Sequence, residues 1–322
     1  MRNSLSLVTA LTLGMACDGQ ERITFEGPEL RQFESCSQTQ DYLAEVMLNT
    51  ALEHRYGMGW GMLESTPDAA ANEGDSSGPS DYTTTNVQEE GVDEVDLVKT
   101  DGEYIYVGQD KGFHIVDSWP VEEAHKLATI EFSGWIRGIF LHGDRIVVLS
   151  TGNEEIPGFD NYSHAKISIV DISTKENPQI VKEYALEGWL GDARMIDGDI
   201  YAIANHYSYL PEEFWDFIYE GDIELPEVDW HLEGDEFTQD LEEKREQARE
   251  LLREPIKQLA REIDVQDIFP KWKNGEQVQD LYSCEEIFRP GNASRFNVLS
   301  LLHVDLEEDT MTAQGLMAEG WT

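Results

Sequence analysis

The feature of this sequence that most constrains its fold is a threefold repeat of short apolar segments. Each copy contains three landmarks: a Gly-acid turn, a run that ends in Val-Asp, and a Gly-Trp pair. In chain order within each type, they are Gly102-Glu103, Gly143-Asp144 and Gly198-Asp199; Ile115-Val116-Asp117, Ile169-Val170-Asp171 and His303-Val304-Asp305; Ser133-Gly134-Trp135, Glu187-Gly188-Trp189 and Glu319-Gly320-Trp321. Apolar runs rich in β-branched residues and bounded by Gly and Asp are typical of strands and turns. The repeat therefore predicts similar β units that follow one another along the chain.

The spacing of the landmarks predicts four-stranded blades and one insertion. The first two copies lie 54 residues apart at both the Asp and the Trp landmark, whereas the second and third lie 134 and 132 apart. These two nearly equal separations place an insertion in the third copy, at about residues 206–295. A period of about 40–55 residues with four short strands is typical of a β-propeller blade. We therefore expect an all-β fold, a β-propeller of about three blades, which is incomplete because a closed ring needs at least four.

Residues 1–17 have the layout of a bacterial export signal. An uncharged apolar run over residues 5–16 is too short to span a bilayer and follows a single positive charge. Gly14 and Ala16 precede Cys17 as in a lipobox, although many lipoboxes carry Leu where Gly14 stands. We expect an extracytoplasmic lipoprotein whose lipid on Cys17 is its membrane attachment. Ordinary signal cleavage, which would release a secreted protein, is the alternative.

The three cysteines are consistent with export. If Cys17 carries lipid, Cys36 and Cys284 remain as an even pair, and such a pair is usually bridged in an oxidising compartment. The bridge would enclose most of the chain and stabilise it by a few kcal/mol in the chain-entropy model. Two unrelated buried thiols are the alternative.

The regions outside the repeat divide the chain further. Residues 38–55 have near-helical apolar spacing after a Ser35-Cys36-Ser37 cap. Gly, Ser, Pro, Ala and Asp dominate the linker. The expected organisation is a tether with this helix over 18–56, a linker over 57–87, blades 1 and 2 with the start of blade 3 over 88–205, the insertion over 206–295, and the rest of blade 3 over 296–322.

The insertion contains an amphipathic helix. Apolar residues recur at helical spacing from Phe237 to Ile263, and Pro255 is expected to bend or interrupt the helix. The apolar face of such a helix must be covered by other residues. We expect it to pack on the rim of the propeller, with a partner protein as the alternative.

The charge of the chain excludes one class of partner and suggests one site. Sixty-five acidic residues against 23 Lys and Arg give a net charge of −42, which repels nucleic acid. Asp93, Glu94, Asp96 and Asp101 form an acidic cluster of the kind that binds Ca²⁺, but without EF-hand spacing. The histidines lack the HxH or HExxH spacing of zinc sites. The sequence predicts no cofactor, with Ca²⁺ at these four residues as the alternative.

The segment Asn86-Val87-Gln88-Glu89-Glu90-Gly91-Val92-Asp93-Glu94-Val95-Asp96-Leu97-Val98-Lys99-Thr100-Asp101-Gly102 resembles the opening signature of a known family. This family consists of secreted bacterial and archaeal proteins with a β-propeller domain distantly related to WD40 repeats. Gly191-Asp192-Ala193-Arg194-Met195-Ile196 and the surroundings of Cys36 and Cys284 are similar to it as well. The resemblance implies a propeller, export, and a structural role for the acidic cluster at the start of the first blade. It also implies further blades beyond Thr322, unless the ring closes by dimerisation.

No motif in the sequence predicts a catalytic site. There is no GxSxG elbow or P-loop after any strand. We expect a non-enzymatic scaffold that binds a protein, peptide or glycan. The alternative is an enzyme, such as a hydrolase or a quinone-type dehydrogenase, with its site in the funnel of the complete propeller. Trp135 and Trp189 are expected to pack within the blades rather than to line a ligand groove.

Overall fold

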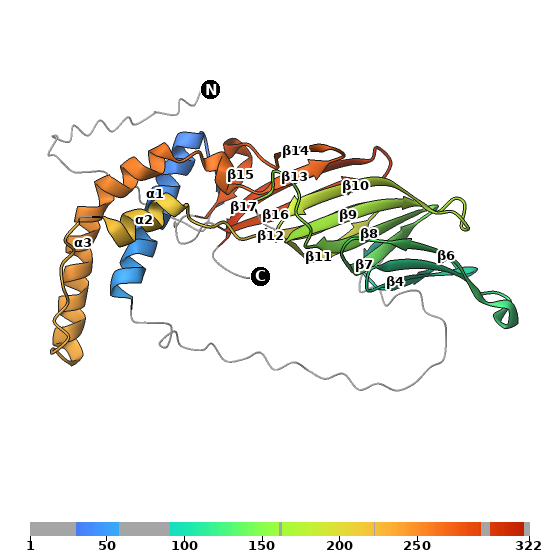
Figure 1. The fold of residues 1–322 in the computed structure, drawn as a ribbon, viewed down its shortest axis with the longest axis horizontal. Coiled ribbons are helices and arrows are strands. Elements are labelled where there is room, and N and C mark those ends of the chain that lie inside the picture. The colour runs from blue at the N-terminus through green and yellow to red at the C-terminus, as the bar shows by residue number, and fades with distance from the viewer. Residues whose placement is uncertain (1–29, 58–90, 161–162, 222, 291–296, 319–322) are drawn as a thin grey trace, which may run out of the picture.

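A computed structural model describes residues 30–57, 91–160, 163–221, 223–290 and 297–318 (Figure 1). The predicted signal with Cys17, and the predicted linker apart from Gly57, lie outside the described residues. Among the described helices, none has both the length and the apolar composition needed to cross a membrane.

The first of three sheets is a single four-stranded blade. Its strands pair in chain order, each antiparallel to the next. They are β3 (Val98–Thr100), β4 (Tyr104–Gln109), β5 (Gly112–Asp117) and β6 (His125–Glu131), with the short helix η1 (Val121–Glu123) between the last two.

The second sheet contains a blade and a hairpin from the insertion. The blade consists of β7 (Trp135–His142), β8 (Arg145–Gly152), β9 (His164–Asp171) and β10 (Gln179–Glu187). The hairpin of β13 (Lys271–Asn274) and β14 (Gln277–Asp280) pairs with the outer strand β10. The insertion lies between two strands of the third blade in sequence, but its hairpin widens the sheet of the second blade.

The third sheet contains the third blade and three additional strands. The blade consists of β11 (Trp189–Ile196), β12 (Asp199–His206), β16 (Asn297–Asp305) and β17 (Thr310–Ala318). Outside it lie β15 (Ile287–Arg289) and β1 (Arg31–Gln32), and β2 (Val92–Glu94) pairs with the inner strand β11. Three blades of predominantly antiparallel strands confirm the predicted all-β propeller architecture.

The Gly-acid and Val-Asp landmarks both form turns at one end of the blades. Gly102, Gly143 and Gly198 have φ angles of 98°, 55° and 95°, a region that glycine adopts without steric cost. The landmark Asp side chains accept backbone N–H hydrogen bonds two residues on, which closes an Asx turn. These bonds join Asp117 to Trp119 (3.4 Å), Asp171 to Ser173 (2.7 Å) and Asp305 to Glu307 (2.9 Å). We call this end of the blades the turn end.

The Gly-Trp landmark lies at the opposite end, which we call the Trp end. A side chain at Gly134 would collide with the Thr151 carbonyl, and one at Gly188 with the Asn205 carbonyl. The glycine therefore lets the chain pass close to the neighbouring strand just before the inner strand of a blade begins.

Apolar side chains between adjacent sheets form two cores. Phe113 and Ile115 of the first blade pack with Ile139 and Val148 of the second. On its other face the second blade contributes residues such as Phe140 to a core shared with the third blade. Since every strand alternates its side chains between the two faces, one sheet can supply both cores.

The helices form a unit beyond the Trp end of the third blade (Figure 1), and its core also includes Val298 of β16 and Met317 of β17. They are α1 (Cys36–Tyr56), α2 (Glu212–Glu220) and α3 (Gly234–Glu262), with short η2 (Val265–Ile268) and η3 (Cys284–Glu286). The apolar face of α3, including Leu252 and Ile256, shares one core with Leu48 and Leu52 of α1. The prediction that α3 packs on the propeller rim was wrong, because the N-terminal helix covers it.

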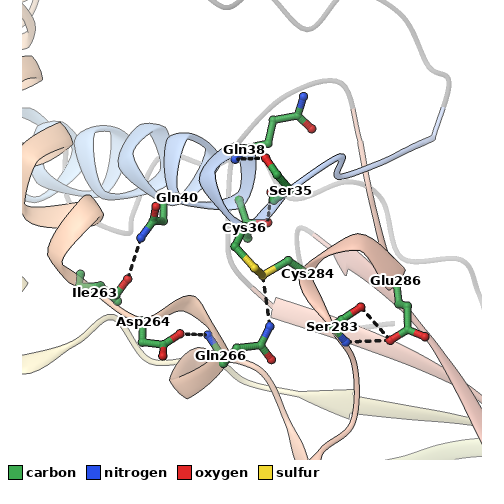
Figure 2. Close-up of a disulfide and its surroundings, with 11 residues drawn as sticks. Ser35, Cys36, Gln38, Gln40, Ile263, Asp264, Gln266, Ser283, Cys284 and Glu286 are labelled. Carbon is green, nitrogen blue, oxygen red and sulfur yellow. Dashed lines mark hydrogen bonds between the residues drawn. A yellow bond between two sulfur atoms is a disulfide. The ribbon is translucent and has the colours of Figure 1, made fainter.

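The predicted disulfide joins α1 to η3 within this unit. Cys36 and Cys284 are bridged, with Cα atoms 5.1 Å apart and a sequence separation of 248. Figure 2 shows that Gln40 of α1 donates to the Ile263 carbonyl (3.1 Å) next to the bridge. The Ser35 side chain caps α1 by accepting from Gln38 N–H (3.3 Å). The bridge therefore fixes the start of α1 against the end of the insertion.

Candidate functional site

The segment of residues 92–100 pairs with the inner strands of the third and second blades and then forms the inner strand of the first. Strand β2 pairs with β11 of the third blade, and Asp96 forms a backbone bridge to Ile139 of the second. The chain then becomes β3, the inner strand of the first blade. Two adjacent carboxylates are bound here by basic residues: Asp93 accepts from Lys99 Nζ (2.7 Å), and Glu94 lies 3.5 Å from Arg194. These contacts join the segment to itself and to the third blade.

The other two acidic residues of the predicted cluster have separate roles. Asp96 accepts from the backbone N–H of Leu97 (2.6 Å). Asp101 accepts from Tyr104 N–H (2.8 Å) and the Tyr106 hydroxyl (2.7 Å). Burial works to raise the pKa of Asp101, but these hydrogen bonds outweigh it and lower the pKa.

The structure therefore does not gather the four carboxylates around one point. Within the described ranges, no three His, Cys, Asp or Glu side chains form a group that could hold a metal ion. Lys99, which is only 6% exposed, takes the position beside Asp93 and also donates to the Glu94 carbonyl (2.7 Å). The arrangement fits a role in joining the blades.

Trp135 is an exposed aromatic side chain at the Trp end. It begins the inner strand of the second blade and is 52% exposed, so the prediction that it packs within the blade was wrong. Trp189, at the equivalent position in the third blade, is half-buried. Lys111 Nζ lies over the Trp135 ring, 5.9 Å from its centre. The ring face therefore already accommodates a cation, as the quadrupole of an indole favours.

A polar cluster of the second blade includes Ser133, two residues before Trp135 in the chain. Lys166 of β9 donates to Glu154 (2.5 Å) and to the Ser133 hydroxyl (2.7 Å), and Ser133 donates to Glu154 (2.7 Å). Glu183 lies 3.6 Å from the same ammonium, and buried His164 lies 3.5 Å from Glu154. The three strongest contacts form a closed triangle of charge-assisted hydrogen bonds.

The triangle is unsuited to activating Ser133 as a nucleophile. Partial burial works to raise the pKa of Glu154, but hydrogen bonds from Lys166 and Ser133 outweigh it and lower the pKa to about 2. A carboxylate this acidic is a poor general base near neutral pH. Lys166 donates hydrogen bonds to both Ser133 and Glu154. The cluster therefore fixes the loop around Glu154.

A buried carboxylate joins this end to the insertion. Glu187, in the residue before Gly188-Trp189, is 1% exposed and accepts from the backbone N–H groups of Asp160 (2.5 Å) and Lys271 (2.9 Å). The Lys271 ammonium returns to the Asp160 carboxylate (3.1 Å). Burial works to lower the pKa of Lys271, but the bond to Asp160 outweighs it and raises the pKa. The loop of the second blade and the inserted hairpin are thereby held together.

The comparison with protein families decides what this architecture is. The model of the family described as Beta propeller domain matches residues 82–322, three quarters of the chain. The chain belongs to this β-propeller family. The chain is also similar to the uncharacterized protein MJ1554 of Methanocaldococcus jannaschii, at 28% identity over 133 residues. That match covers 41% of this chain and 19% of the relative's length. No solved structure matches the propeller.

The polar cluster of this propeller was missed by the sequence analysis. Lys166 gives a signal, because it is a charged residue in the strand-like run Ala165-Lys166-Ile167-Ser168-Ile169-Val170. A buried ammonium requires a carboxylate partner, so such a lysine predicts one nearby. Nothing in the sequence identifies Glu154, which follows in a loop without a motif, as that partner.

Proposed function

We propose that this β-propeller is an extracytoplasmic binding scaffold that recognises a protein, peptide or glycan through its Trp end. The observation that carries this proposal is Trp135, a large aromatic side chain that is half exposed at the start of an inner strand. A propeller provides a rigid frame whose loops can differ without loss of the fold. Aromatic residues at such positions are the usual anchors of binding surfaces because they bury a large area with few rotatable bonds.

The surroundings of Trp135 favour binding over chemistry. The polar residues beside it, Ser133 and Glu154, are held in the hydrogen-bonded triangle with Lys166. Such a pre-organised shell lowers the entropy lost when a partner is bound. Lys111 already lies over one face of the indole ring, so a partner is proposed to contact the part of the ring that Lys111 leaves exposed.

The prediction that Trp135 anchors a ligand is tested with a matched pair of exposed tryptophans. The labelled full chain is applied to arrays of glycans and of peptides, and the Kd of each bound ligand is measured. Replacing Trp135 by Ala is expected to weaken binding about tenfold or more, as for an anchor residue. Trp119→Ala is the control, because Trp119 is 74% exposed and lies at the turn end. Equal effects of the two substitutions, or no bound ligand, would contradict the proposal.

The proposed location rests on a separate observation. The Cys36–Cys284 disulfide is of the kind that persists in oxidising compartments. Cys17 lies outside the described residues, and its lipidation is part of the proposal. We expect the wild-type protein to sediment with membranes and Cys17→Ser to be released into the soluble fraction, because the proposed lipid on Cys17 supplies the attachment. Ser6→Ala is the control variant, and an unchanged distribution of Cys17→Ser would show that Cys17 is not the anchor.

A further inference from the structure

Each blade packs on its neighbours through two different faces. In the second blade, Ile146 and Val148 belong to the core shared with the first blade. Val147 and Leu149, which alternate with them along the strand, belong to the core shared with the third blade. We call the face that packs on the preceding blade the backward face, and the face that packs on the following blade the forward face. The first and third blades lie on either side of the second (Figure 1), so each has one face that these two cores do not use.

The backward face of the first blade is apolar. Ile105 pairs with Val116 across β4 and β5. The equivalent pair of the second blade, Ile146 and Val170, is buried in the core shared with the first blade. Ile105 and Val116 are only half-buried, and they belong to none of the apolar cores that the described residues form. Val98 extends the same face at the inner strand and is 48% exposed.

The forward face of the third blade is apolar as well. Leu301 pairs with Ile203 across β12 and β16, and it is 46% exposed. Phe113, which lies equally far before the landmark Asp of the first blade, is fully buried in the core shared with the second blade. Tyr201 is 45% exposed, and the His303 ring stacks on it with the ring centres 4.8 Å apart. The third blade therefore presents the side chains of a blade interface that the described cores do not include.

The middle of these two open faces lacks charge, although the chain has 65 acidic residues and a net charge of −42. The uncharged side chains are Ile105, Val107 and Val116 on the first blade, and Tyr201, Ile203 and Leu301 on the third. Two copies of so acidic a chain repel each other through most of their surfaces. The open faces are therefore the places where two copies can approach at the lowest electrostatic cost.

We propose that two copies of this chain associate head to tail, with the backward face of each first blade packed on the forward face of the other copy's third blade. The same combination of faces already packs twice within one chain, between the first and second and between the second and third blades. Because each copy has one open face of each kind, a two-fold arrangement covers all of them. The result is a ring of six blades, within the range of about 4–8 that is typical of propellers. The proposal is independent of ligand binding at the Trp end.

The area of the open faces is sufficient for a stable dimer. Four strands about 4.8 Å apart, each about six residues or 20 Å long, give a blade face of about 400 Å². The four open faces of two copies then bury about 1,600 Å² in total, the usual size of a specific interface between proteins. Removal of apolar side chains such as Val98 and Leu301 from water is the main contribution to the stability of this interface.

Sedimentation velocity of the purified full chain measures the association. We expect a species of twice the 36.6 kDa of one chain, with a Kd below about 10 µM, as an interface of this size allows. Because salt screens the repulsion between two acidic copies, the Kd should fall as NaCl is raised from about 0.05 to 0.5 M.

Two substitutions test the two open faces separately. Val98→Asp and Leu301→Asp each place an unpaired carboxylate in an interface from which water is excluded, and each is expected to raise the Kd about 100-fold or more. Both side chains are about half exposed in a single copy, so circular dichroism should show an unchanged fold. Leu251→Asp is the matched control, because Leu251 is 49% exposed on α3, away from both faces.

A mixture of the two variants tests the head-to-tail arrangement. In a dimer of either variant alone both interfaces are damaged, whereas a mixed dimer of Val98→Asp with Leu301→Asp keeps one native interface. The mixture should therefore associate at a concentration at which each variant alone is monomeric. A wild-type monomer at about 100 µM, as expected if another segment of the chain covers either face, would overturn the proposal. A dimer that only one of the two substitutions dissociates, or that Leu251→Asp dissociates equally well, would overturn it too.

Discussion

Loss of the Cys36–Cys284 disulfide is expected to lower the free energy of unfolding by about 5 kcal/mol. The bridge spans 248 residues of sequence, and in the chain-entropy model the stabilisation grows with the logarithm of the loop that is closed. Urea unfolding of the oxidised wild type is compared with that of the double variant Cys36→Ala, Cys284→Ala. A reducing agent should destabilise the wild type by a similar amount and have no effect on the double variant.

The loss of stability is expected to begin in the helical unit. Cys36 is the first residue of α1, and the same helix is otherwise held by the β1–β15 pair and by its core with α3. Those contacts remain in the double variant, so the blades should still fold. Hydrogen exchange should therefore increase more in α1 and α3 than in β8 and β9. A destabilisation below about 1 kcal/mol, or an equal increase of exchange everywhere, would contradict this account.

The parts of the fold that follow from the repeat were predictable, since each landmark meets a local backbone requirement. Gly143 and Gly198 have positive φ in their hairpins, and Asp171 and Asp305 close Asx turns. Such requirements depend on neighbours in sequence, so they recur in every copy and can be recognised without a structure. The same reasoning fails where partners are distant along the chain.

The position of α3 shows why distant contacts were not predictable. The apolar spacing of Leu252 and Ile256 identifies which face of the helix is buried, but contains no information on what buries it. The covering residues, such as Leu48, lie about 200 positions earlier, in another helix. The apolar spacing of that helix does not identify its partner either. Only the Cys36–Cys284 pair connects the two regions, and a pair of cysteines by itself also fits two separate thiols.

The candidate sites were predicted less well because exposure and partners depend on tertiary packing. Trp135 recurs at a repeat position, which predicts a shared backbone geometry but not whether the indole is covered. The acidic cluster around Asp93 suggested a cation, and the cation beside it is Lys99, six residues later. The polar triangle of Glu154 joins a loop to a neighbouring strand and has no signature in sequence spacing.

Acidification is expected to destabilise the protein through His206, the last residue of β12. Its side chain is 5% exposed, and burial lowers the pKa to about 4 although the Ile268 backbone and the Asp160 charge work to raise it. The unfolded chain takes up a proton near the ordinary histidine pKa of about 6.5, while the folded protein stays neutral until about pH 4. The contribution of His206 to stability is therefore complete above about pH 6.5 and is lost as the pH falls to about 4, by about 3 kcal/mol in total.

The variant His206→Gln isolates this contribution from the titration of the carboxylates. Gln is uncharged at every pH. The free energy of unfolding of the variant should therefore fall about 3 kcal/mol less than that of the wild type between pH 7.5 and pH 4. Both proteins are unfolded with urea at each pH, and His125→Gln, at an exposed position, is the control. Because His206 lies where the chain leaves the third blade for the helical unit, the acid-induced loss should be seen first in exchange of the β12 amides near this end. Identical pH profiles for the wild type and His206→Gln would show that the buried imidazole does not determine the acid sensitivity.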